Sequence, residues 1–261
     1  MSARDPLAIL TLAARPQDLT LTASAKRRVR RVEIRLDLVD PADWAHRVRE
    51  VERAFPSARL LATLRRRTDG GNWPDDEDRR EAMDRILAIG GWDAVDLEAD
   101  APDLDALLAS VRRRAGDLRL VLSKHSFGAV EGAELAGQVD QVRRRAADLG
   151  AHVAKWAGFV ADLEEDGPGL VRILSTWSGP AIPAVFPMGL GAEPWRVACS
   201  IVSGGWGYGH DGAGSVAPGQ LPWKAFDALI GSVPGSDRWD REWFSGVVSA
   251  TALALREEVA A

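Results

Sequence analysis

The stretch GAHVAKWAGFV, residues 150–160, places one lysine, Lys155, inside an otherwise apolar run. A short apolar run of this kind is typical of a strand that is buried on both faces, as in a parallel sheet. A buried ammonium group is costly unless it is paired, and burial in general shifts the pKa of a lysine toward neutrality. An amine in that state is a candidate nucleophile. The alternative is a structural lysine whose head group reaches solvent at the end of a strand.

Seven further apolar runs resemble this one, at residues 7–14, 31–39, 59–66, 92–100, 118–126, 181–189 and 197–205. The segments between them are amphipathic. In PADWAHRVREVERAF (41–55), for example, apolar residues recur every three or four positions and charges fill the other face. Eight strands alternating with helices predict a parallel sheet closed as a (β/α)8 barrel, in a single domain over residues 1–261. A doubly wound open sheet is the alternative. Residues 15–30 form a poor helix, and the segment after residue 221 is longer than one closing helix requires.

Composition excludes several classes of function. The net charge is −5, so acidic residues outnumber basic ones and nucleic acid is not the expected partner. The basic run KRRVRR (26–31) is therefore interpreted as a solvated helix end. Cys199 is the single cysteine, which leaves neither an internal disulfide nor a cysteine metal site, and no other set of residues has metal-ligand spacing. Since no run approaches about 18 apolar residues, we expect no membrane segment and a cytoplasmic location.

Polar residues alternate with apolar ones inside the predicted strands, so they share one face of the sheet. Glu33, Arg35 and Asp37 lie on the same face of one strand. The next strands repeat the pattern with Thr63 and Arg65, Asp96 and Glu98, and Ser123 and His125. In a barrel these side chains converge near the carboxyl ends of the strands, where the active sites of such barrels lie. This convergence favours a functional role for Lys155 over a structural one.

Seven motifs in this order resemble the type I 3-dehydroquinate dehydratase family. They are VEIRLDLVD (32–40), LRRRTDGG (64–71), VDLEAD (95–100), VLSKHSF (121–127), HVAKWA (152–157), FPMGLGAEPWRVA (186–198) and VAPGQLP (216–222). Each motif is weakly specific alone, and the set at barrel spacing is specific. The resemblance implies a (β/α)8 lyase of the shikimate pathway, in aromatic amino acid biosynthesis. Such an enzyme dehydrates 3-dehydroquinate to 3-dehydroshikimate through a lysine Schiff base.

The resemblance also implies roles for three catalytic residues. Lys155 would form an imine with the C3 ketone of the substrate. His125 would be the general acid–base, taking the C2 proton and returning a proton to the leaving C1 hydroxyl, because an imidazole can act in both directions near neutral pH. Asp69 stands where the family usually has a glutamate before two glycines, and it would orient the histidine with a reach shorter by one methylene.

Five substrate-binding residues follow from the same resemblance: Glu33, Arg35, Arg65, Arg196 and Gln220. Glu33 and Arg35 match the substrate-positioning pair, while Arg65 and Arg196 match arginines near the substrate carboxylate. Gln220 belongs to a glycine-rich loop, residues 203–220, that would close over the substrate. In this loop Val216 replaces a serine of the family, so one hydrogen bond to the substrate is expected to be absent unless Ser215 supplies it.

Several alternatives remain open from the sequence. The stretch GYGHDG (207–212) fits a dinucleotide-binding pattern, but it leads into a loop and not directly into a helix, so no cofactor is expected. The expected partner is a small-molecule substrate, with a homodimer possible because the family is often dimeric. The function could also be that of a catalytically silent family member that binds a cyclic hydroxy-carboxylate. Another Schiff-base enzyme, such as an aldolase, is the remaining option.

Overall fold

The computed structural model describes residues 8–12, 21–74, 79–114, 117–212, 217–232 and 240–260. Eight parallel strands form one sheet in the order β7-β6-β5-β4-β3-β2-β1-β8. They are β1 Ala8–Leu12, β2 Arg31–Arg35, β3 Arg59–Thr63, β4 Trp92–Glu98, β5 Arg119–Val130, β6 Val153–Val160, β7 Ile182–Met188 and β8 Gly207–His210. The two end strands of this order, β7 and β8, lie beside each other, so the sheet curls into a nearly closed barrel.

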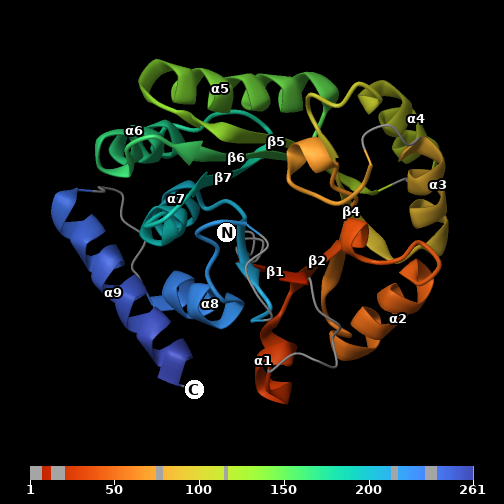
Figure 1. The fold of residues 1–261 in the computed structure, drawn as a ribbon, viewed down its shortest axis with the longest axis horizontal. Helices are drawn as coiled ribbons and strands as arrows, with labels where there is room; N and C mark the ends of the chain where they lie inside the picture. The colour runs from red at the N-terminus through yellow and green to blue at the C-terminus, as the bar shows by residue number, and fades with distance from the viewer. Residues whose placement is uncertain are drawn as a thin grey trace.

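Helices surround the strands, as Figure 1 shows. They are α1 Ala23–Arg28, α2 Trp44–Ala54, α3 Arg79–Ile89, α4 Leu104–Arg114, α5 Gly132–Leu149, α6 Leu163–Ser175, α7 Glu193–Ser203, α8 Trp223–Ser232 and α9 Arg241–Ala260. Two short 3-10 helices, η2 Leu36–Leu38 and η3 Arg67–Asp69, follow β2 and β3. The prediction of a single (β/α)8 barrel is confirmed. Among the described helices, none is long and apolar enough to span a membrane.

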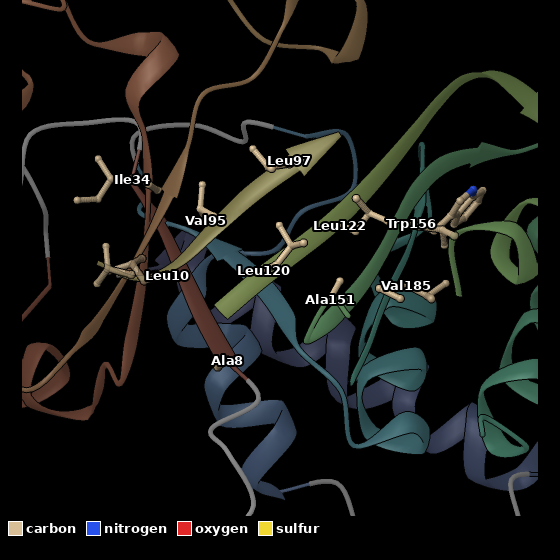
Figure 2. Close-up of a cluster of buried hydrophobic side chains, with 14 of the residues drawn as sticks. Ala8, Leu10, Ile34, Val95, Leu97, Leu120, Leu122, Ala151, Trp156 and Val185 are labelled. Carbon is tan, nitrogen blue, oxygen red and sulfur yellow. The ribbon is translucent and has the colours of Figure 1, made fainter. Parts of the chain in front are cut away.

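Strand alternation separates two apolar layers. Outward-facing residues such as Leu10, Leu122 and Trp156 pack between the strands and the helices (Figure 2). Inward-facing residues fill the barrel interior, and they include Ile9, Leu61, Ala94, Val121 and Val153. Since successive strand residues point to opposite faces, Val153 and Lys155 point inward while Ala154 and Trp156 point outward. The same alternation therefore builds the core and aims the lysine into the barrel.

The prediction of a strand at 197–205 is wrong. Most of that run belongs to α7, which has Pro194 in its first turn and ends at Gly204 in a left-handed conformation, with φ 60°. A short, continuous apolar run fits a buried helix as well as a buried strand, because hydrophobicity alone does not separate the two. Pro194 and Gly204 are typical signals for the start and the end of a helix, and they favour a helix over a strand here.

The eighth strand lies instead in the range predicted as the closing loop, 203–220. Residues 207–210 of the GYGHDG pattern form β8 itself, so the pattern is not a turn that follows a strand. Residues 217–220 form the turn that leads to α8. Ser215 and Val216, whose roles were predicted from the resemblance, lie outside the described residues. After residue 221 the described residues include two helices, α8 and α9.

The barrel closes at a narrow seam between β7 and β8. The backbone N–H of Trp206 donates to the carbonyl of Pro183 over 3.1 Å. No ladder joins these two strands within the part of the chain that the structure describes. A Cβ added to Gly205 would lie 1.9 Å from the same carbonyl oxygen, so only glycine allows the two backbones to approach this closely.

We predict that Gly205→Ala destabilises the protein. The methyl group has to displace the Pro183 carbonyl from the seam, and such overpacking costs about 1–3 kcal/mol. Urea denaturation followed by circular dichroism measures the change in the free energy of unfolding.

Gly137→Ala is the matched control, because a Cβ there would have no atom within 4 Å. Gly137 lies inside α5, so alanine should stabilise the protein by about 0.5–1 kcal/mol. Equal effects of the two substitutions would contradict the account of the seam.

Candidate active site

Lys155 lies on β6 with its side chain inside the barrel, where the residue is 7% exposed. Its Nζ donates a hydrogen bond to Oδ2 of Asp96 over 3.0 Å and lies 3.6 Å from Oε1 of Glu33. The ring of Tyr208 lies beside it, with 4.4 Å between Nζ and the ring centroid. Two carboxylates and an aromatic face thus compensate the buried charge, which explains how this strand carries an ammonium group.

Asp96 connects the lysine to a second cation. Its carboxylate lies 2.8 Å from Nη2 of Arg65 and accepts a hydrogen bond of 2.6 Å from the hydroxyl of Ser123. Burial alone would favour the neutral acid, but Arg65 and Lys155 outweigh that effect and hold the pKa of Asp96 well below its usual range. Asp96 therefore remains an anion beside the lysine across the physiological pH range.

Glu33 and Glu98 complete this buried network of charges. The hydroxyls of Thr11 and Thr63 donate to the two oxygens of Glu33 over 2.8 and 2.9 Å, which fixes the orientation of its carboxylate. Glu98 lies 3.2 Å from Nη1 of Arg65. Burial disfavours the charge on Arg65, but Asp96, Glu98 and Glu33 together raise its pKa above the usual value. Arg65 is thus held by protein carboxylates.

His125 lies on β5 and is packed against Phe127, with the two rings stacked. Its Nδ1 is buried without a hydrogen-bond partner and lies 3.9 Å from Oδ1 of Asp69, too far for a hydrogen bond. Burial lowers the pKa of His125 well below its usual value, and the charges of Arg65 and Lys155 lower it further. The imidazole is therefore neutral at pH 7 and able to accept a proton.

Asp69 is engaged by a different partner. Its Oδ2 accepts hydrogen bonds from Nη2 and Nε of Arg66 over 2.6 and 3.0 Å. Burial and the nearby charge of Glu98 nevertheless raise its pKa above the usual value. In this structure the predicted orienting acid lies near the histidine without binding it.

Arg196 lies on α7, lines the same pocket as Lys155 and His125, and is 4% exposed. Its Nε donates to the carbonyl of Pro187 over 2.8 Å, and it forms no ion pair with any residue the structure describes. Burial lowers the pKa of Arg196 to about 10, so the guanidinium still carries its charge at pH 7. It differs in this from Arg35, which forms two hydrogen bonds with Asp37 over 2.9 and 2.7 Å.

One pocket at the carboxyl ends of the strands brings all eight predicted site residues together. It is lined by Lys155, His125, Asp69, Glu33, Arg35, Arg65, Arg196 and Gln220. Gln220 contributes a buried amide oxygen that has no hydrogen-bond partner among the described residues. Lys124 lies outside this set, because its side chain points outward and pairs with Asp100. The geometry therefore offers an amine, a neutral base and a free buried cation to one ligand.

Several residues of this pocket, and of the network that supports it, were not predicted from the sequence. Asp96 and Ser123 were placed on the inner face but were not assigned to the site, although the alternation pointed to them. Tyr208 could not be placed, because the eighth strand was predicted in the wrong segment. Phe186 and Met188 line the pocket from β7, and their spacing of two along a buried strand is the signal that could have found them.

Comparisons with known proteins match the chain to one family. A family model described as Type I 3-dehydroquinase matches residues 8–232. A 3-dehydroquinate dehydratase of Pyrobaculum aerophilum is 31% identical over 217 residues, 83% of this chain and 67% of that protein. One of Methanopyrus kandleri is 32% identical over 191 residues, 73% of this chain and 81% of that protein.

A solved structure shares the fold. The crystal structure of 3-dehydroquinate dehydratase from Geobacillus kaustophilus superposes with a TM-score of 0.72 at 20% identity, covering 90% of this chain and 93% of that one. Together with the match to most of the sequence, the comparisons confirm the resemblance of the seven motifs. The chain belongs to the type I 3-dehydroquinase family.

Proposed function

We propose that this protein dehydrates 3-dehydroquinate to 3-dehydroshikimate through an imine on Lys155, as a step of the shikimate pathway. The observation that carries the proposal is the pair of Lys155 and His125 in one pocket. Lys155 is held by two carboxylates in a buried interior, and the pKa of His125 is lowered so that the imidazole is neutral. Family membership supports the overall reaction.

The first step forms the imine. The ammonium of Lys155 gives up one proton, and the free amine adds to the C3 carbonyl carbon. The resulting carbinolamine takes a proton back on its hydroxyl and loses water, which gives a protonated imine. The positive charge then lies where the ammonium charge lay before. Asp96 and Glu33 therefore stabilise the protonated imine by the same contacts that hold the ammonium, at no cost in reorganisation.

The second step moves a proton through His125. The neutral imidazole takes the C2 proton, and the electron pair flows into the protonated imine to give an enamine. The C1 hydroxyl then leaves with a proton from the imidazolium, which restores the imine and creates the new double bond. Burial and the charges of Arg65 and Lys155 destabilise the imidazolium, so it gives its proton up readily. Hydrolysis of the imine releases the product and returns Lys155.

Arg196 is the residue that we assign to the substrate carboxylate. It is a buried cation in the pocket with no ionic partner among the described residues, whereas Arg65 already binds Asp96 and Glu98. A planar guanidinium can bind a carboxylate with two parallel hydrogen bonds. Arg65 then acts mainly by holding Asp96 beside the lysine, a role different from the one that the resemblance implied.

We predict that borohydride added with 3-dehydroquinate traps a covalent adduct on Lys155. Peptide mass spectrometry should find the mass of the reduced ligand on the peptide that contains Lys155. Lys155→Ala should abolish the adduct and nearly all dehydratase activity, followed by the ultraviolet absorbance of the conjugated product. Lys124→Ala is the matched control, because its amine pairs with Asp100 outside the pocket. A label on Lys124 would contradict the assignment.

His125→Ala should separate imine formation from proton transfer. We expect kcat to fall by about 10²- to 10⁴-fold, the usual contribution of a general acid–base. Because the amine remains, the variant should still form the imine, and the adduct should accumulate on the intact protein by mass spectrometry. Turnover at the wild-type rate would show that another group is the base.

The pH profile of kcat/KM tests the state of the histidine. The base must be neutral, and a lowered pKa keeps it neutral to a lower pH than a free imidazole. The acidic limb that belongs to His125 should therefore lie below the usual value of about 6.5. Initial rates between pH 4.5 and 8.5, an interval of about two units on each side of that value, locate the limb. A limb at or above 6.5 that disappears in His125→Ala would contradict the assignment.

A further inference from the structure

The C-terminal helix α9 lies beyond the matched segment, which ends at residue 232. It packs against α7 and α8 on the outside of the barrel, as Figure 1 shows. Val247 and Thr251 are 0% and 1% exposed, so the helix is firmly attached along one face. None of the α9 side chains that the structure describes lines the candidate active site.

One contact of α9 leads toward that site. Phe244 stacks on Trp195 of α7, with 3.8 Å between ring centroids and 28° between ring planes. The indole also packs against α6, where a Cβ added to Gly167 would lie 2.7 Å from ring atoms of Trp195. The indole therefore contacts both α6 and α9.

Trp195 immediately precedes Arg196, whose guanidinium enters the pocket. The same end of α7 also supports the turn at residues 217–220. A Cβ added to Gly219 would lie 3.0 Å from Cβ of Ala192 and 2.8 Å from the carbonyl oxygen of Gly189. A displacement of α7 at Trp195 would therefore move Arg196. It would also move Ala192, against which the turn that contains Gln220 packs.

We propose that Phe244 is a positioning residue for substrate binding. It fixes α7 through Trp195 and so sets the places of Arg196 and of the turn at 217–220. Lys155 lies on β6 and His125 on β5. The contact between Phe244 and Trp195 joins α9 to α7 and involves neither of these strands. The contact consequently acts on the affinity for the anion and leaves the covalent chemistry unchanged. This inference rests on the proposed function, because it takes the carboxylate of the substrate as the ligand of Arg196.

The test is the steady-state kinetics of three α9 variants with 3-dehydroquinate. Phe244→Ala should raise KM about 2- to 13-fold, the range that corresponds to the loss of one aromatic pair, with kcat nearly unchanged. Phe244→Tyr keeps the stacked ring and should restore the wild-type KM. Leu253→Ala is the matched control, because it removes an apolar side chain from the same helix at a position that is 58% exposed.

A thermal unfolding scan of each variant separates positioning from stability. A lower Tm with an unchanged KM in Phe244→Ala would overturn the inference. So would a fall in kcat at constant KM. Should Phe244→Ala fail to fold, Phe244→Leu fills most of the same space without a stacked ring and is expected to raise KM in the same way.

A double-mutant cycle tests the route through the arginine. If Phe244 acts through Arg196, the effect of Phe244→Ala on KM should shrink in the Arg196→Ala background, whereas independent effects would add. If the effects of the two substitutions on KM are fully additive, Phe244 does not act through Arg196. A wild-type protein without dehydratase activity would contradict only the proposed function. The affinity of the same variants for quinate, by calorimetry, would then decide the positioning role.

Discussion

The pairing of Lys155 with Asp96 is the interaction on which the site depends. An ammonium group inside a barrel is tolerated only when carboxylates compensate it, and each of those carboxylates needs its own partners. Asp96 is held by Arg65 and Ser123, and Glu33 by two threonines. The need to compensate the charge of Lys155 thus accounts for polar residues on five neighbouring strands, β1 to β5. The network keeps the amine in place before the substrate arrives.

Two buried arginines have different roles because their surroundings differ. Arg65 and Arg196 carry the same charge and line the same pocket, but Arg65 lies among carboxylates while Arg196 contacts a backbone carbonyl. Their pKa values are displaced in opposite directions for this reason. Arg65 is a structural part of the network, and Arg196 retains an unbalanced charge for a ligand. Composition and motif matches alone do not separate these two roles.

Much of the fold could be predicted from the sequence, because an apolar run and its flanking amphipathic segment report the burial of a strand and its helix. The run at 197–205 was predicted as a strand because α7 is buried along most of its length and is therefore mostly apolar. Because of this error, β8 and its residue Tyr208 were not predicted. Alternation placed Glu33, Asp96 and Ser123 on the inner face. The gap of 3.9 Å between His125 and Asp69, and the capture of Asp69 by Arg66, depend on side-chain placement that no sequence pattern encodes.

The pairing of β1 with β8 has a consequence for synthesis on the ribosome. These strands lie at residues 8–12 and 207–210, so the partner of β1 is among the last parts of the barrel to be made. At a translation rate of about 5–20 residues per second, one edge of the nascent sheet stays uncovered for about 10–40 s. An uncovered strand edge is a template for pairing with other chains. The emerging barrel therefore carries a template for wrong pairing until its last strand is in place.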